Sequence, residues 1–189
     1  MRRRVLDAAR REFADRGFDG VSLELIAAAA GFSKGAVYSN FATKADLFLA
    51  LMDESVSARI EAALEVVATS GPAPGPSTAR RLGDRLIAQF SADTDWQLLL
   101  VEFWMRAVRD PTAREPFVRY RRRLRQVIAD EIDKVFPDGD PELSSHDIAT
   151  TILALSNGIA IERILDPEAA GDSLFGVVLG RLFGRATPS

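Results

Sequence analysis

The sequence predicts an all-α protein of about nine helices. Apolar residues recur at helical spacing in every segment that can be assigned, and no segment shows the sustained alternation of a strand. The residues that end helices fall between these segments, because proline cannot continue a helix and glycine weakens it. They are densest in SGPAPGPS, residues 70–77, and in FPDGDP, residues 136–141.

The first helix is predicted by Leu6, Ala9 and Phe13, which form one apolar stripe. Similar stripes mark later helices: Trp96, Leu99, Leu100, Phe103 and Ala107; Phe117, Tyr120, Leu124 and Val127; Ile148, Ile152, Leu155 and Ile159; and Leu174, Val178 and Leu182. In chain order we expect helices over residues 2–16, 22–29, 33–39, 43–68, 77–91, 94–109, 112–135, 144–164 and 168–184.

The second and third helices are short and lie close together in the sequence. Ser22 can cap the second helix, because its hydroxyl oxygen can accept a hydrogen bond from a free backbone N–H. Gly31 follows that helix where the chain must turn with positive φ, and Ser33 can cap the third helix. Two helices joined by a tight glycine turn form a helix-turn-helix, whose second helix enters the major groove of DNA.

The composition of the third helix fits this role. Lys34 lies at its N-terminus, where phosphate is attracted, and Gly35 and Ala36 keep the first turn slim for close approach to base edges. Tyr38 and Asn40 can donate hydrogen bonds to phosphate oxygens. The sequence therefore predicts a DNA-reading helix here.

The residues that follow continue the pattern. Val37 and Phe41, four positions apart, are expected to face the core. Thr43 begins the fourth helix with Asp46 three residues later, a capping arrangement, and Lys44 adds positive charge at this predicted anion site. Each feature also has an ordinary explanation: Gly31 as a simple helix stop, Tyr38 as the edge of the core and Lys44 as a surface lysine. Their order and spacing together favour DNA binding.

At this point the sequence resembles the TetR family of transcriptional regulators over Val5 to Asp53. The elements that carry the resemblance are Ala9, Phe13, Gly17, Phe18, Ser22, Ile26, Ala27, Ala30, Gly31, Ser33, Tyr38, Phe41, Lys44 and Leu47. It implies DNA-contacting positions at Ser22, Lys34, Gly35, Ala36, Tyr38, Asn40 and Lys44, and we expect Ser33 to be a further DNA-binding residue. The family commonly has His where Asn40 stands, and a polar or basic residue where Glu24 stands. Asn40 can still donate to phosphate, whereas Glu24 is expected to contact none.

The resemblance fades after about residue 55, as it does across this family. We expect a helix-turn-helix DNA-binding domain over residues 1–48 and a helical ligand-binding and dimerisation domain over 49–189. The segment LLLVEFWMRAVRDP resembles a subset of the family with a larger ligand-binding domain. The implied function is a repressor released from its operator by a small-molecule effector. The alternative is a helical small-molecule-binding or scaffold protein without specific DNA binding.

Aromatic residues gather on consecutive helices of the second domain, where they can enclose an apolar effector pocket or form plain core. The residues considered for a pocket are Trp96, Phe103, Trp104, Phe117, Tyr120 and Arg121. Arg121 lies near the apolar stripe of its helix, although a solvated role paired with nearby acids is the simpler explanation. No effector can be named from these residues.

A helix-turn-helix of this kind reads two half-sites roughly 34 to 36 Å apart, so we expect a homodimer bound to an inverted repeat. Gly176, Gly180 and Gly184 recur on one face of the last helix, where small residues permit close packing. Together with Ala154 and Gly158 they predict a four-helix interface between two copies. The alternative is a frayed final helix.

Composition excludes several other classes. The chain has no cysteine, so neither disulfides nor thiolate metal sites can form. The only histidine, His146, stands at a predicted helix start, and we expect neither catalysis nor a metal or cofactor. No run of about 18 apolar residues occurs, which predicts a soluble cytoplasmic protein. Residues 1–50 hold eight Lys or Arg against six Asp or Glu, while the rest hold sixteen against twenty-one. A DNA-binding module on an acidic body would show this difference, and ordinary scatter in charge explains it equally well.

Overall fold

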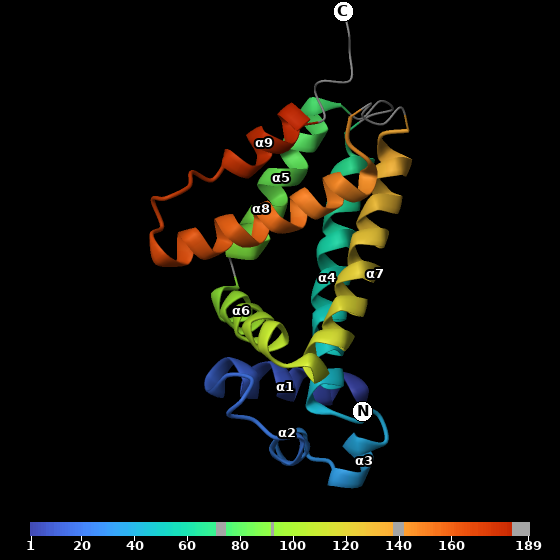
Figure 1. Ribbon diagram of the computed structural model, residues 1–189, viewed down its shortest axis with the longest axis vertical. Helices are drawn as coiled ribbons and strands as arrows, with labels where there is room; N and C mark the ends of the chain where they lie inside the picture. The colour runs from blue at the N-terminus through green and yellow to red at the C-terminus, as the bar shows by residue number, and fades with distance from the viewer. Residues whose placement is uncertain (71–74, 92, 138–141, 183–189) are drawn as a thin grey trace, which may run out of the picture. The chain divides into compact units, whose positions relative to one another are not determined.

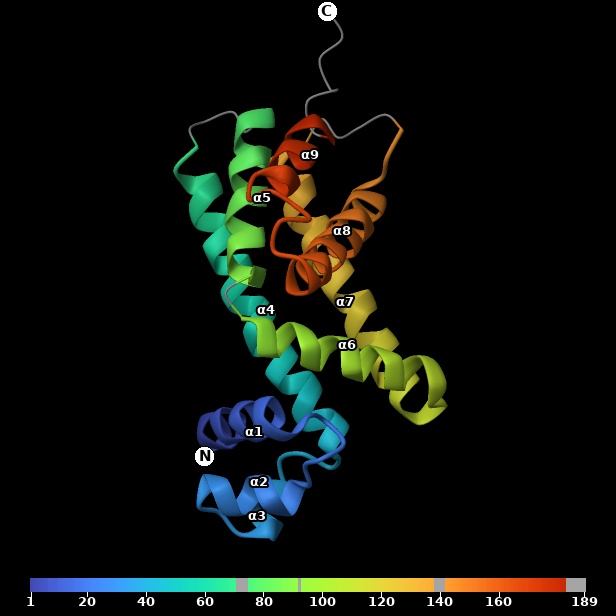
Figure 2. The ribbon, with the colours of Figure 1, turned by 90° about the vertical axis from the view of Figure 1, so that its left-hand side faces the viewer.

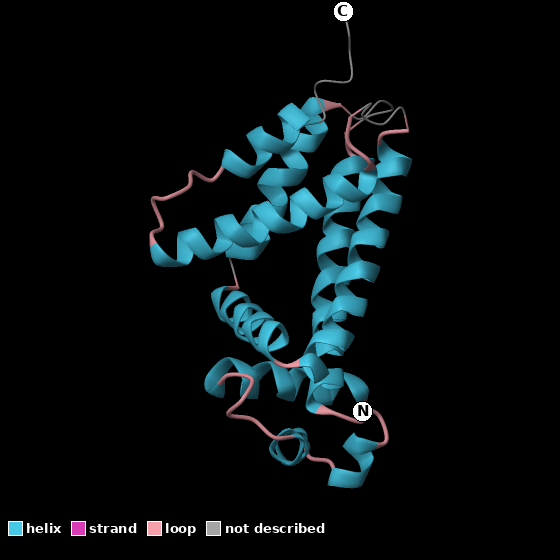
Figure 3. Cartoon of the chain, in the orientation of Figure 1, coloured by secondary structure: helices cyan, strands magenta, loops and turns pink. Residues whose placement is uncertain are grey.

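The computed structural model describes residues 1–70, 75–91, 93–137 and 142–182, and all regular structure in these ranges is α-helical (Figures 1 and 3). The helices are α1 Arg2–Arg16, α2 Leu23–Ala30, α3 Lys34–Tyr38, α4 Lys44–Ala68, α5 Pro76–Ser91, α6 Thr94–Arg109, α7 Pro111–Val135, α8 Ser145–Leu165 and α9 Leu174–Leu182. The predicted all-α class is confirmed.

The first eight predicted helices agree with the structure to within one residue at each end. The last is wrong at its start, because α9 begins at Leu174 rather than at residue 168. Local hydrogen bonds hold a turn in the intervening segment: Asp166 Oδ1 accepts from the Glu168 N–H at 3.0 Å, and Arg163 pairs with Asp172 at 2.6 Å. Asp side chains that bind nearby backbone N–H groups compete with helix formation in this way.

The chain forms two compact units. The first comprises Met1–Ser57 and Leu98–Tyr120, and the second comprises Ala58–Gln97 and Arg121–Ser189. The first unit therefore contains the predicted domain 1–48 and also takes in the end of α6 and the start of α7. Helices α4, α6 and α7 each contribute residues to both units.

Aromatic side chains form the core of the first unit. Phe103 of α6 is fully buried, with its ring stacked on Phe48 at 4.3 Å between centroids and edge-on to Phe18 at 4.9 Å. Phe13 of α1 stacks on Phe18 at 5.5 Å. These are the offset and edge-to-face arrangements that aromatic pairs prefer. The aromatic core thus joins α6 to α1 and α4, the helices on either side of α2 and α3 in the sequence.

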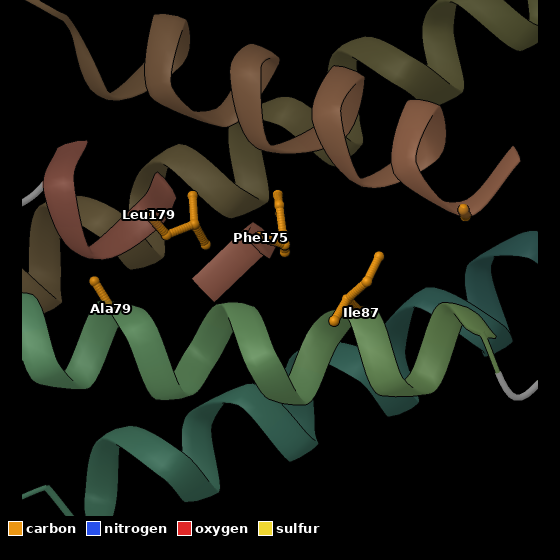
Figure 4. Packing of buried hydrophobic residues seen from close by; sticks show 5 residues of the cluster. Ala79, Ile87, Phe175 and Leu179 are labelled. Atoms are coloured by element: carbon orange, nitrogen blue, oxygen red, sulfur yellow. The ribbon is translucent and has the colours of Figure 1, made fainter. Parts of the chain in front are cut away.

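Helices α5, α8 and α9 build much of the core of the second unit. Figure 4 shows Phe175 and Leu179 of α9 facing Ala79 and Ile87 of α5. All four side chains are at least 98% buried. Ala160 of α8 belongs to the same cluster.

The glycines of α9 pack against α5 of the same chain. A Cβ built on Gly83 of α5 would lie 2.6 Å from the Cα of Gly176, and a Cβ on Gly176 would lie 2.5 Å from the Arg80 carbonyl oxygen. A Cβ on Gly180 would lie 3.0 Å from the Pro76 carbonyl oxygen. The close helix approach predicted for this face is therefore made within one chain. This corrects the assignment of the buried Gly176 to an interface between copies.

The two small residues predicted on α8 have a different environment. Ala154 and Gly158 are both exposed, and a Cβ on Gly158 would meet no atom within 4 Å. Gly184, the remaining residue of the predicted interface, lies outside the described residues. Among the described residues of that interface, Ala154 and Gly158 are exposed in a single chain, whereas Gly176 is buried and Gly180 is half-buried.

Helix α8 has the length and apolar composition of a membrane span, alone among the helices in the described ranges. The face of α8 opposite the exposed Ala154 and Gly158 is buried, as in a core helix. Ile148 and Ala149 pack in one buried cluster and Ala160 in another. Asn157 is buried and donates a hydrogen bond to the Leu153 carbonyl at 2.6 Å. Packing within the second unit accounts for the apolar character of this face.

Candidate nucleic-acid interface

The helix-turn-helix has the predicted caps and turn. The Ser22 hydroxyl accepts a hydrogen bond from the Leu25 N–H at 3.2 Å, and the Ser33 hydroxyl accepts from the Ala36 N–H at 3.3 Å. Between them Gly31 adopts a left-handed conformation with φ 73° and ψ 35°. Glycine adopts this conformation without the steric cost of a Cβ. Helices α2 and α3 lie side by side across this turn (Figure 2).

Helix α3 has one buried face and one open face. Val37 is fully buried and Phe41, just beyond the helix, is 4% exposed, as predicted. Lys34, Gly35 and Tyr38 are exposed, and a Cβ on Gly35 would meet no atom within 4 Å. A helix that is anchored on one side and slim on the other can approach another surface closely.

Glu24 of α2 contacts two residues of this open face. Its Oε1 atom pairs with the Lys34 ammonium at 2.6 Å and accepts a hydrogen bond from the Tyr38 hydroxyl at 3.0 Å. The Lys34 contact, then backbone hydrogen bonding and the Tyr38 contact, lower the pKa of Glu24 from 4.5 to about 2. The same carboxylate raises the pKa of Lys34 and of Tyr38. No sequence signal linked these residues, because the contact depends on how α2 and α3 pack.

Asn40 and Ser39 close the C-terminal end of α3. The Asn40 side-chain amide donates to the Ala36 carbonyl at 3.0 Å and lies 3.9 Å from Met1 Sδ. The Ser39 hydroxyl donates to the same Ala36 carbonyl at 2.8 Å. Asn40 is exposed, and its amide is already bound to the helix end.

Lys44 has a different contact from the predicted one. Its ammonium donates to the carbonyl oxygens of Phe18 at 2.6 Å and Val21 at 2.7 Å, and it lies 4.4 Å from the centre of the Phe18 ring. Partial burial lowers its pKa. The predicted cap is present, since Asp46 Oδ2 accepts from the Thr43 N–H at 2.9 Å. An acid of the chain itself therefore occupies this helix end, which corrects the prediction of an open anion site there.

The segment between α1 and α2 is also held by α6. Glu102 accepts hydrogen bonds from the backbone N–H groups of Phe18 at 2.9 Å and Asp19 at 3.3 Å. Arg106, one turn further along α6, pairs with the Asp19 carboxylate at 2.5 Å. Sequence analysis assigned no role to Glu102 or Arg106. Within the first unit, these two side chains fix the segment that leads into the helix-turn-helix.

The N-terminal arginines are further candidates for DNA contacts, and they were not predicted as such from the sequence. Contact of Asn40 with Met1 brings the start of α1 to the C-terminal end of α3. Arg2 lies over the Phe41 ring at 5.8 Å, and Arg3 is exposed. The run of three arginines was the available signal. Positive charge at this point adds to that of Lys34.

The predicted pocket residues fall into two groups. Phe103, Trp104, Phe117 and Tyr120 belong to the first unit and are linked by ring contacts through Phe117. Trp104 is 37% exposed, and the other three are buried. The three buried rings pack as a core, and Trp104 lies at its exposed edge.

Trp96 and Arg121 belong to the second unit. Trp96 is buried, and Arg121 is half-buried. Sequence analysis missed the neighbouring Gln97, which is only 1% exposed and whose side-chain oxygen and nitrogen both have no hydrogen-bond partner in the structure. Buried amides are normally paired, and Gln97 lacks a partner at both ends of its amide, whereas Asp84 and Gln89 of the same unit each have one buried oxygen without a partner in the described structure.

Two family models match the chain. The model of bacterial regulatory proteins of the tetR family matches residues 5–51, and the model of the C-terminal region of BetI-type transcriptional repressors matches residues 76–174. The second match alone covers more than half of the chain.

The chain is 29% identical over 133 residues to the HTH-type transcriptional repressor AcnR of Corynebacterium diphtheriae, covering 70% of this chain and 64% of that protein. It spans less than two thirds of the length of the curated relatives it matches. Among solved structures, the fatty acid degradation regulator FadR from Bacillus halodurans has a TM-score of 0.64 at 17% identity, covering 96% and 93% of the two chains.

A TetR transcription regulator from Haloarcula marismortui also has a TM-score of 0.64, at 19% identity, with 98% and 97% of the two chains covered. At such identities the likeness shows a shared fold. The family models, the capped helix-turn-helix and this shared fold agree, and the chain belongs to the TetR family of bacterial regulatory proteins.

Proposed function

We propose that this chain is a sequence-specific DNA-binding transcriptional repressor that acts as a homodimer on an inverted-repeat operator. The observation that carries the proposal is the open face of α3, where Lys34, Gly35 and Tyr38 are exposed around a buried Val37 anchor. The family and the repressors among the curated relatives support it. A repressor of this kind acts on DNA in the cytoplasm, and the proposal requires no enzymatic step or cofactor.

The proposal gives the residues of α3 separate tasks. Lys34 and Tyr38 bind phosphate oxygens and set the register of the helix on the duplex. Gly35 and Ala36 bring the first turn of α3 close to base edges in the major groove. Ser22 and Ser33 hold the ends of α2 and α3, and Arg3 adds a phosphate contact. Asn40 joins them once its amide has turned from the helix end.

Selection of bound sites from a random duplex library tests this proposal. Recovery of an inverted repeat bound by a dimer is the expected result, with half-sites about one helical turn apart. The logarithm of the affinity should fall with the logarithm of salt concentration with a slope of about −0.9 for each phosphate neutralised. A folded dimer that recovers no preferred sequence would instead indicate the helical ligand-binding or scaffold protein.

Release by a small-molecule effector completes the proposal. The supporting observation is Gln97, whose buried side-chain amide has no partner in the described structure. An uncharged effector that carries both a hydrogen-bond donor and an acceptor would satisfy both ends of this amide. Trp96 and Arg121 stay in the proposal as further contacts. An effector can release DNA only through its different affinities for the two states of the protein.

The variant Gln97→Leu distinguishes a ligand-binding role of Gln97 from a structural role. Replacing an unpaired buried amide by an apolar side chain should leave the free energy of unfolding unchanged or raise it by about 1 to 3 kcal/mol. Operator binding should persist, while stabilisation by hits from a thermal-shift screen of neutral small molecules should disappear. A clear loss of stability in this variant would mean that Gln97 has a structural role and would remove the support it gives to an effector site.

A further inference from the structure

Glu24 contacts both side chains, Lys34 and Tyr38, to which the DNA-binding proposal assigns the phosphate contacts of α3. One oxygen, Oε1, contacts both the Lys34 ammonium at 2.6 Å and the Tyr38 hydroxyl at 3.0 Å. The Lys34 ammonium in turn lies 5.3 Å from the centre of the Tyr38 ring. The Lys34 and Glu24 side chains are 64% and 45% exposed, so this cluster lies on the surface beside the open face of α3.

A carboxylate oxygen and a phosphate oxygen make the same kind of contact with these donors. Both carry negative charge, and both accept hydrogen bonds from ammonium and hydroxyl groups. The Tyr38 hydroxyl has one donor hydrogen, so a DNA phosphate can accept it only when Glu24 gives it up. The Lys34 ammonium has further N–H groups, but its charge acts fully on a phosphate only when Glu24 no longer pairs with it. After the exchange, the freed carboxylate stays close to the negatively charged backbone of the duplex, which opposes binding.

We propose that Glu24 is an internal competitor of DNA phosphate for Lys34 and Tyr38, which weakens binding to DNA of any sequence. This inference rests on the proposed DNA-binding function. Because the competitor cancels about one positive charge of the interface, it also makes the affinity less dependent on salt. An effector changes the DNA affinity by only a limited free energy. Weaker phosphate contacts keep the DNA affinity low enough for an effector to release the complex.

Glu24→Gln tests the competition directly. The variant is compared with wild type on two probes, the duplex recovered by selection and a random-sequence duplex of the same length. Affinity for both duplexes should rise by roughly two- to fivefold, the range expected when an exposed charge contact is removed. The log–log salt slope should become steeper by about 0.9. A thermal melt of each variant confirms that the fold is retained.

Two further variants separate competition from a general charge effect. Asp15→Asn removes one exposed negative charge from α1, in the same unit, and should change affinity and slope less than Glu24→Gln. In a Lys34→Gln background, most of the gain from Glu24→Gln should disappear, because the positive charge for which Glu24 competes is absent and only the neutral Tyr38 hydroxyl remains. A gain that persists in full in that background contradicts competition for Lys34.

Other outcomes assign Glu24 a different role. Weaker binding of Glu24→Gln to both duplexes would show that the carboxylate positions Lys34 and Tyr38 for DNA, which overturns the inference. Loss confined to the selected duplex would indicate that Glu24 accepts a hydrogen bond from a cytosine amino group and reads the base. An unchanged affinity also overturns it. Wild-type protein that binds neither duplex would refute the proposed function itself, a result that is distinguishable from all of these.

Discussion

Glu102 of α6 accepts a hydrogen bond from the backbone N–H of Phe18 at 2.9 Å, immediately after the C-terminal end of α1. Its second oxygen accepts from the Asp19 N–H at 3.3 Å. Gly17, the residue before this pair, has φ 70° and ψ 171°, a conformation that is essentially restricted to glycine. A single carboxylate thus accepts hydrogen bonds from two backbone N–H groups in the segment between α1 and α2.

Glu102→Ala should therefore destabilise the protein. The substitution leaves the N–H groups of Phe18 and Asp19 without their charged acceptor, which costs about 1 to 3 kcal/mol of unfolding free energy. Urea unfolding followed by circular dichroism measures this loss. Glu115→Ala is the control, because Glu115 makes only an exposed pair with Arg119 and its removal should cost roughly 0 to 1 kcal/mol. Equal losses in the two variants would mean that the Glu102 hydrogen bonds contribute no more than a surface ion pair.

Two glycines of the first unit should respond to alanine in opposite ways. Gly17→Ala forces an L-residue into a strained conformation and places a methyl group about 3.0 Å from Glu102 Oε2, so stability should fall by about 1 to 3 kcal/mol. Gly35→Ala meets no atom within 4 Å and should leave stability unchanged or higher, because alanine favours helix. Its added methyl group should nevertheless weaken binding to the selected duplex. Retention of full DNA affinity by Gly35→Ala would show that the first turn of α3 does not approach the bases.

Local signals in the sequence were sufficient for the helix-turn-helix. Caps at Ser22 and Ser33, the glycine turn at Gly31 and the buried positions Val37 and Phe41 each depend on residues a few positions apart. Patterns that involve residues only a few positions apart can be recognised in a single sequence.

Contacts between distant residues could not be predicted in the same way. Glu24 and Lys34, on different helices, pair only because α2 and α3 pack together, and Glu102 reaches Phe18 across 84 positions. The glycine spacing of α9 correctly indicated close helix packing but could not identify α5 as the neighbour. The late start of α9 was missed because Asp166 accepts a hydrogen bond from the Glu168 N–H, which competes with the helix, and because the pairing of Asp172 with Arg163 depends on the folded segment.

The acidity of Glu24 should depend on Lys34. The folded-state pKa of Glu24, about 2, lies below the ordinary value of 4.5, so its contribution to stability is present above pH 4.5 and is lost as pH falls through about 2. Lys34 is the largest cause of this shift, and Lys34→Gln should return the pKa towards 4.5. Carbon NMR of the Glu24 carboxyl group between about pH 3.5 and 6 measures the change, with Asp15→Asn as a control that leaves it untouched. A wild-type carboxyl group that already titrates near 4.5 would contradict the contact seen in the structure.

Substitution of α8 and α9 glycines should distinguish folding from assembly. Gly158 is exposed with open space around it, so Gly158→Arg should preserve the helical circular dichroism signal and, if α8 packs against α8 of a second copy, produce a monomer in sedimentation equilibrium. Gly176→Ala should instead lower the unfolding free energy, because its Cβ would overlap the Arg80 carbonyl oxygen and the Asp84 side chain of the same chain.

The dimer must also place two α3 helices on half-sites, so the monomeric variant should lose affinity for the inverted repeat far more than for a single half-site. Arg119→Ala, which removes an exposed charge of α7, should leave assembly unchanged and serves as the control. A Gly158→Arg variant that stays dimeric would move the interface away from this face of α8, and Ala154, one turn earlier on the same exposed face, would be excluded with it.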